Sequence, residues 1–201
     1  SLDNYIPSLV ADDYFLEPSY DIGLYYSGGN FQPGPNRSGF TTTLVNQDNP
    51  TLDNDAIGQL YSAYQGIDTL HILPRLPSNV DGTGHIDMWF YIVDEDTVII
   101  SEFDPGSDAT AIQVTEDGAT YMQDLGFEVI RVPDQNSFHP NDSQCHFTYT
   151  NAFRVNDRIF ISSYGNGDPD HLNRDQQALE AWQAAAPEAE IIQIDSYDII
   201  W

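Results

Sequence analysis

The stretch His85-Ile86-Asp87-Met88-Trp89 opens the middle one of three segments that repeat one pattern. The segments cover residues 24–74, 85–133 and 147–195. Each has the residue pattern of strand, strand, helix and strand, and they follow one another at a period of about sixty residues. The repeat predicts a single α/β domain over residues 1–201, built from ββαβ modules.

Turn and cap signals divide each segment into its elements. In the middle segment they predict a hairpin over 85–93 and 97–101, a helix from 109 to 125 that ends at Gly126, and a strand over 127–132. In the first segment they predict strands over 24–26, 40–45 and 70–73, with a helix from Asn54 to Gly66. In the third they predict strands over 147–155, 158–162 and 190–194, and a helix from Asn173, where Gln176 completes a capping box, to Ala186.

Polar residues occupy the start of the first strand, or the turn beside it, in each module. His85 and Asp87 lie two apart on a predicted strand and therefore project from the same face. Asn30 follows Gly28-Gly29, where a backbone without side chains can approach another group closely. We therefore expect three modules around a common axis, with first strands inside and helices outside. The helices of the second and third modules should then not cover opposite faces of one sheet.

Several functions are compatible with these polar residues. The pair of His85 and Asp87 could act on one ligand by proton transfer and cation binding, could bind a metal, or could be a satisfied polar pair at a strand end. Asn151 lies among aromatic residues, so its amide either ties a loop or contacts a ligand. We expect His85, Asp87 and Asn151 to converge on one cleft.

The charge of the chain restricts its partners. It has 32 acidic residues against 6 basic ones, all of them Arg, which gives a net charge of −26. Such a field repels nucleic acid and anionic membranes and attracts cationic ligands. Alternatively, the acidic excess serves solubility, and on composition alone this explanation is favoured. The compartment stays open between secreted and cytoplasmic, with the extracellular setting favoured. No run of eighteen apolar residues predicts insertion into a membrane.

Three quoted motifs resemble one family. They are Gly28-Gly29-Asn30, Gly84-His85-Ile86-Asp87-Met88-Trp89, and Tyr149-Thr150-Asn151 followed by residues 156–161. In order and spacing they resemble the pentein-fold guanidino-group-modifying enzymes, specifically the bacterial peptidylarginine deiminase and agmatine deiminase family. The resemblance extends over nearly the whole chain. It implies a pentein-type α/β propeller, of which three of an expected five ββαβ modules are visible.

The resemblance also implies a reaction. In that family a cysteine thiolate attacks the guanidinium carbon, ammonia leaves, and water releases a ureido product, without cofactor or metal. By matching position, His85 would be the general acid and base, and Asp87 would bind the guanidinium nitrogens. Asn151 would order the site, and substrate would also contact Gly29, Asn30 and Trp89. The implied partner is a guanidino small molecule or an arginine-containing peptide.

Two departures from the family pattern concern the nucleophile and a second aspartate. Cys145, the only cysteine, lies just before the segment of Asn151 and is not assigned as nucleophile. A His-Cys motif is expected after Trp201, and the upstream Arg-Asp motif of the family is absent. The chain therefore resembles a truncated domain that is inactive alone. The motif wording favours peptidylarginine over agmatine as substrate. The alternative of another class is a non-catalytic, acidic, cation-binding module.

Overall fold

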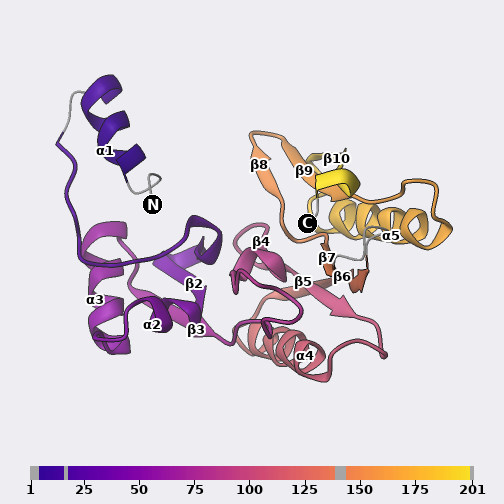
Figure 1. The fold of residues 1–201 in the computed structure, drawn as a ribbon, viewed down its shortest axis with the longest axis horizontal. Helices are drawn as coiled ribbons and strands as arrows, with labels where there is room; N and C mark the ends of the chain where they lie inside the picture. Colours follow the sequence, from indigo (N-terminus) through magenta and orange to yellow (C-terminus); the bar gives the residue numbers. More distant parts are fainter. Residues whose placement is uncertain (1–4, 16–17, 139–143, 200–201) are drawn as a thin grey trace.

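The computed structural model describes residues 5–15, 18–138 and 144–199 (Figure 1). The remaining residues of the predicted domain 1–201 lie outside the described part. Figure 1 shows three groups of strands and helices side by side in chain order, preceded by the helix α1 (Ile6–Val10). This helix lies in a lead-in for which the sequence predicts no regular element.

Each of the three modules forms one mixed sheet with the same topology. The first strand pairs antiparallel with the second, and the second pairs parallel with the strand that follows the helix. The predicted ββαβ repeat is thus confirmed. The strands, in module order, are β1 (Gln32–Pro33), β2 (Ser38–Thr42) and β3 (Thr69–Leu73); β4 (Phe90–Ile92), β5 (Thr97–Phe103) and β6 (Glu128–Phe138); β8 (Phe153–Val155), β9 (Arg158–Ser163) and β10 (Glu190–Asp195).

The module helices begin and end at identifiable caps. Asp53 and Asp108 accept hydrogen bonds from the first-turn amides of α3 (Asn54–Gln65) and α4 (Ala109–Asp124). As predicted, Gly66 and Gly126 follow these helices in the left-handed conformation, with φ of 71° and 96°. The short helix α2 (Leu44–Asp48) follows β2.

The third helix starts earlier than predicted. The structure begins α5 (Pro169–Ala185) after Asp168, whose side chain accepts a hydrogen bond from the Asp170 amide. Proline at the first helical position needs no amide partner, so the pair Asp168-Pro169 is a stronger start signal than Asn173. The helix end falls at Ala185, next to the predicted Ala186.

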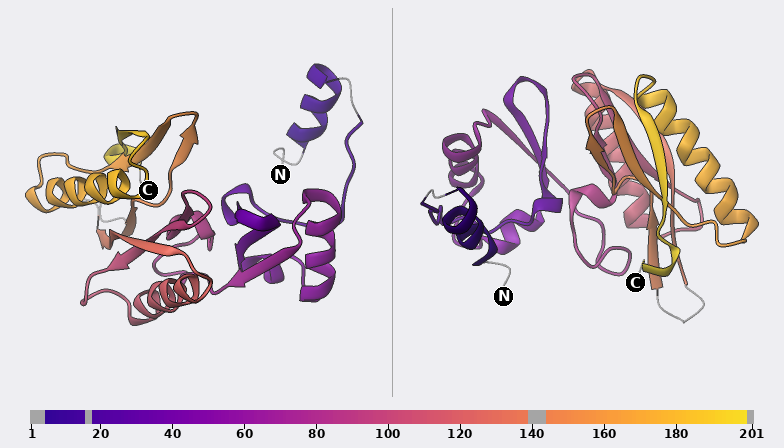
Figure 2. Two further views of the ribbon diagram at one scale, coloured as in Figure 1. Left: turned by 180° about the vertical axis from the view of Figure 1, so that it is seen from behind. Right: turned by 90° about the horizontal axis from the view of Figure 1, so that it is seen from above.

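Helices alternate with sheets across the molecule (Figure 2). On β5, Val98 and Ile100 pack in the cluster that includes α4, whereas Ile99 packs in the cluster that includes Trp182 of α5. The helix α5 contacts β6 as well as β10. The expectation that α4 and α5 would not cover opposite faces of one sheet is therefore wrong. The helices α4 and α5 are each shared between neighbouring sheets, whereas α3 packs on the first sheet alone, and β5 is buried on both faces.

The first strands of the first two modules lie together, as expected for inner strands. Gln32 joins them, because its side-chain amide donates to the Phe90 carbonyl at 3.1 Å and its oxygen accepts from the Ile92 amide at 2.8 Å. The strand predicted over 24–26 is not formed, and β1 lies instead at residues 32–33, between the strands predicted over 24–26 and 40–45.

Two long predicted strands are interrupted where the modules meet. Residues Ile86–Met88 form a 3-10 turn before β4, so His85 and Asp87 are not strand residues. The strand predicted over 147–155 is divided into β7 (Gln144–Thr148) and β8, with Asn151 between them. β7 pairs with β6, which continues past Pro133 instead of ending at Val132. At the turn of residues 86–88, side chains of the neighbouring modules bond the backbone groups that a strand partner would otherwise bond.

The contact of α4 with Trp89 gives a test of this packing. A Cβ at Gly118 in α4 would lie 2.6 Å from Cζ3 of Trp89, whose ring is fully buried and has no room to move. We expect Gly118→Ala to lower the free energy of unfolding by on the order of 1–3 kcal/mol, through overpacking.

Gly58→Ala in α3 is the matched control, because a Cβ there meets no atom within 4 Å. It should stabilise the protein by up to about 1 kcal/mol, since alanine favours a helix more than glycine does. Urea unfolding of both variants measures the difference. Equal effects of the two substitutions would contradict the packing of Trp89 against α4.

Candidate functional site

His85 and Asp87 converge on the backbone of Gly29. A Cβ at Gly29 would lie 2.5 Å from Oδ2 of Asp87 and 2.8 Å from Nδ1 of His85. The imidazole and the carboxylate thus meet at one point, although they come from a 3-10 turn and not from one face of a strand. Only glycine lets both side chains come this close to the backbone, which explains its presence in the first module.

Asn30 fixes the approach of the two modules. Its side-chain oxygen accepts hydrogen bonds from the amides of Thr42 and Ile86, each at 3.1 Å. Thr42 Oγ1 also donates to the Gly84 carbonyl at 2.7 Å. With 1% of its surface exposed, Asn30 ties the loop of Gly29 to the turn of His85. A buried amide can tie a loop or contact a ligand, and these hydrogen bonds make Asn30 a loop tie.

The third module holds the same turn from the other side. Thr150 Oγ1 donates to the Asp87 carbonyl and Thr148 Oγ1 to the Met88 carbonyl, both at 2.9 Å. These hydroxyls, with Asn30, satisfy backbone groups that a neighbouring strand would otherwise bond. The chain can therefore leave the strand conformation at residues 86–88 while the Ile86 amide and the carbonyls of Asp87 and Met88 keep hydrogen-bond partners.

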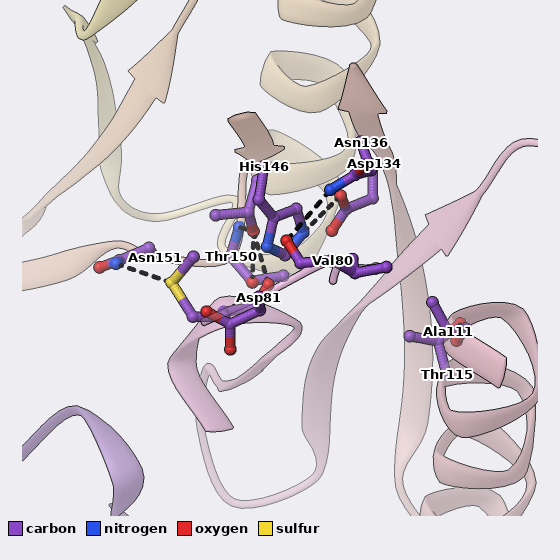
Figure 3. Close-up of polar contacts among 12 residues, drawn as sticks. Val80, Asp81, Ala111, Thr115, Asp134, Asn136, His146, Thr150 and Asn151 are labelled. Carbon is purple, nitrogen blue, oxygen red and sulfur yellow. Dashed lines mark hydrogen bonds and ion pairs between the residues drawn. The ribbon is translucent and has the colours of Figure 1, made fainter. Parts of the chain in front are cut away.

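Asn151 lies beside this turn and is exposed (Figure 3). Its Nδ2 is 3.5 Å from Sδ of Met88, the residue after Asp87. A hollow of about 290 Å³ opens next to it, and all three modules contribute to its lining. The lining includes Gly29, Asp87 and Ala152 but neither His85 nor Asn151, so of the three residues expected to share one cleft only Asp87 lines this hollow.

Trp89 belongs to the core. Its ring is fully buried and packs against Gly118 of α4 and Phe90. Direct contact of Trp89 with a ligand is not supported by this position, and its packing instead fixes the C-terminal end of the turn that carries Asp87.

The carboxyl of Asp87 has an altered proton affinity. Burial, and then the charge of Asp81, raise its pKa from 3.8 to about 7, although a backbone hydrogen bond works in the opposite direction. Within the described residues, Oδ1 of Asp87 has no hydrogen-bond partner. A half-buried carboxylate with an unpaired oxygen beside an imidazole can accept donors from a cation and exchange protons.

Six residues that support this site were not predicted as site residues from the sequence: Thr42, Asp81, Asp134, His146, Thr148 and Thr150. Asp81-Gly82-Thr83-Gly84 carried a signal, since aspartate two residues before threonine is typical of a side chain that caps a turn. The two threonines around Tyr149 carried none, because threonine is equally common in strands.

Within residues 5–15, 18–138 and 144–199, no group of three or more His, Cys, Asp or Glu residues is arranged to hold a metal ion. In the same residues no helix combines the length and the apolar character that crossing a membrane requires.

One comparison with known proteins identifies a family. A model of the family described as Porphyromonas-type peptidyl-arginine deiminase matches residues 2–201. A comparison with curated protein sequences gives no significant match.

Solved structures share the fold at low sequence identity. A C. jejuni agmatine deiminase with substrate bound has a TM-score of 0.82 at 19% identity, covering 100% of this chain and 59% of the other. A crystal structure ascribed to a peptidyl-arginine deiminase has a TM-score of 0.83 at 22% identity, covering 100% and 61%. An agmatine deiminase of Enterococcus faecalis has a TM-score of 0.78 at 16% identity, covering 98% of this chain and 60% of the other. The chain thus spans about three fifths of the length of these pentein-fold proteins.

Replacing the carboxyl of Asp87 tests the electrostatics of the site. Because the folded pKa is raised, ionising Asp87 costs stability, and this cost grows as the pH rises from about 4 through about 7. Asp87→Asn cannot ionise, so we expect it to be more stable than wild type above about pH 8, by on the order of 3 kcal/mol. At about pH 4 the two proteins should unfold at similar urea concentrations. A stability difference that does not change with pH would contradict the raised pKa.

Proposed function

The chain belongs to the Porphyromonas-type peptidyl-arginine deiminase family, and from this premise we propose that it binds a guanidino group between His85, Asp87 and the Gly29 backbone. The bound group would be hydrolysed to a ureido product and ammonia. The observation that carries this proposal is the approach of both side chains to one point at Gly29.

A guanidinium fits the chemistry of this point. It is a planar cation that donates parallel N–H bonds, and Asp87 has an oxygen without a partner among the described residues. A cation next to Asp87 would offset the cost of its buried charge, so binding and ionisation favour one another. The net charge of −26 would draw cations toward the protein.

In the proposed reaction His85 moves protons and a thiolate forms the covalent bond. The sulfur attacks the guanidinium carbon, and the C–N bond breaks as His85 supplies a proton to the departing ammonia. Water then attacks the same carbon, one of its protons passes to His85 and the other to solvent, and the C–S bond breaks to release the ureido product and the thiolate. Asp87 holds the remaining nitrogens throughout.

We place the nucleophile outside the 201 residues. Cys145, the only cysteine, is 2% exposed and packs in the core cluster that contains Phe147 and Trp182. A buried thiol in apolar surroundings is a packing group, and its thiolate is disfavoured. By this proposal the thiol is supplied by sequence beyond Trp201, and the 201-residue chain alone binds but does not turn over substrate.

Arginine residues in peptides are the proposed substrate. The family description and the wording of the His85–Trp89 and Tyr149–Asn151 motifs support this choice. The alternative is agmatine, favoured by the likeness in fold to an agmatine deiminase with its substrate bound. The alternative of another class is a non-catalytic, acidic module that only binds cations.

Two neighbouring glycines provide the test of guanidinium binding. A Cβ at Gly29 would occupy the space between the two side chains, whereas a Cβ at Gly28 meets no atom within 4 Å. We expect Gly29→Ala to lose at least about tenfold in affinity, or about 1.4 kcal/mol. Gly28→Ala and Cys145→Ser should bind like wild type. Isothermal titration calorimetry with a blocked arginine tripeptide, and separately with agmatine, measures this.

The two ligands separate the candidate substrates. Tighter binding of the tripeptide supports the peptidylarginine proposal, and tighter binding of agmatine supports the alternative. Unchanged affinity of Gly29→Ala would mean that the cation binds elsewhere. Release of ammonia from either ligand by the 201-residue chain would contradict the placement of the nucleophile.

A further inference from the structure

Asp81 organises the loop that leads to His85. Its Oδ1 accepts hydrogen bonds from the amide and the hydroxyl of Thr83, at 2.9 and 2.7 Å, and its Oδ2 accepts from the Gly84 amide at 2.8 Å. The Thr83 hydroxyl in turn accepts a hydrogen bond from the His85 amide at 3.2 Å. One carboxylate thus fixes the two residues before His85 and, through Thr83, the backbone of His85 itself.

Asp81 is also a buried charge near Asp87. It is 3% exposed, and its charge is one of the causes that raise the pKa of Asp87. The other segments around Asp87, residues 28–33, 91–92 and 148–152, contain no acidic, basic or imidazole side chain. The remaining titratable neighbours are His85, on the same turn, and Tyr91, which lines the same hollow, whereas the Tyr149 hydroxyl is bonded to Asp175. The nearest cation on the loop is Arg75, whose Nη1 would lie 3.3 Å from a Cβ at Gly84. Among these neighbours, Asp81 supplies the negative charge that raises the pKa of Asp87.

A buried pair on β6 and β7 accompanies Asp81 (Figure 3). Nε2 of His146 lies 2.7 Å from Oδ1 of Asp134, and both side chains are almost fully buried. Burial by itself lowers the pKa of His146, but the charge of Asp134, the hydrogen bond to it and the charge of Asp81 outweigh burial, so the pKa is raised. The ring of Phe103 stacks on the imidazole of His146, with 5.7 Å between the ring centroids.

The pair is tied to the loop by hydrogen bonding as well as by charge. Asn136, directly opposite His146 in the β6–β7 ladder, donates from Nδ2 to the carbonyl of Val80 at 3.1 Å. Val80 precedes Asp81 in the chain. The loop of Asp81 and the pair of His146 and Asp134 therefore form one unit. It brings two carboxylates and one imidazole together next to the turn that carries His85 and Asp87.

We propose that Asp81, backed by the buried pair of His146 and Asp134, is a positioning residue of the guanidinium site. It holds the loop that orients His85, and it adds a negative charge that controls when Asp87 ionises. His146 lies between these carboxylates and is their counterion, since the charges of Asp134 and Asp81 both act on its imidazole. This inference rests on the proposed function only for the roles of His85 and Asp87.

The charge role is tested by titrating Asp87 in the free protein. In wild type the side-chain carbon of Asp87, followed by ¹³C NMR, should titrate near pH 7. Asp81→Asn removes a like charge and keeps the size of the side chain, so the Asp87 midpoint should fall by at least about half a pH unit. An unchanged midpoint in a folded Asp81→Asn variant would overturn the charge role.

Asp94→Asn is the matched control. Asp94 also caps a turn, accepting from the amides of Asp96 and Thr97, but it lies at the far end of β4 from the site. This variant should leave the midpoint of Asp87 unchanged. A shift as large as that of Asp81→Asn would mean that any loss of acidic charge is sufficient, and the assignment to Asp81 would fail.

Thr83→Val tests the positioning role and does not depend on the stability of the Asp81 variant. Thr83 is exposed, and valine keeps its shape while removing the link between Asp81 and the His85 amide. We expect faster hydrogen exchange at His85 with no change in the Asp87 midpoint. Unchanged exchange at His85 would overturn the positioning role.

His146 gives a second measurement in wild type. Its ¹⁵N resonances should titrate above the ordinary value of 6.5. A midpoint at or below 6.5 would overturn its role as counterion. All of these titrations are made without ligand, so they can hold in a protein that fails to bind a guanidino compound, and the two proposals can fail separately.

Discussion

The structure depends on satisfying backbone groups at the place where three sheets meet. Residues 84–88 have no neighbouring strand, so side chains of the adjoining modules bond their amides and carbonyls. Asn30 and Thr42 contribute from the first module, and Thr148 and Thr150 from the third. Because an unpaired buried amide or carbonyl costs about 1–3 kcal/mol, these bonds fix the modules relative to one another.

The same bonds create the candidate site. A turn held from both sides can leave the strand conformation and direct two neighbouring side chains to one point, which is the Gly29 backbone. That point lies at the junction of modules, where a cavity can form without opening a core. The cost is two buried carboxylates, Asp81 and Asp134, and a half-buried one, Asp87, with one buried imidazole to offset them. An arriving guanidinium would complete this balance of charge.

Periodicity and caps predicted the modules well, since strands, helices and turns are set by local spacing and by residues such as Gly66 and Gly126. The local pattern could not show where strands stop for tertiary reasons. His85 and Asp87 alternate like strand residues, yet Asn30 and Thr150, distant in sequence, hold them in a turn. The sharing of α5 between two sheets was likewise hidden, because one apolar helix face does not reveal how many partners it has.

The proposed function requires that a guanidinium binds where His85 and Asp87 meet Gly29. The most direct test adds arginine amide to the ¹⁵N-labelled chain and maps the NMR shift changes. We expect the largest changes on the amides of Gly29, His85 and Asp87, and we expect them to saturate together. Changes centred elsewhere, such as on Arg131 and Arg174 of the hollow between β6 and α5, or no saturable change, would contradict it.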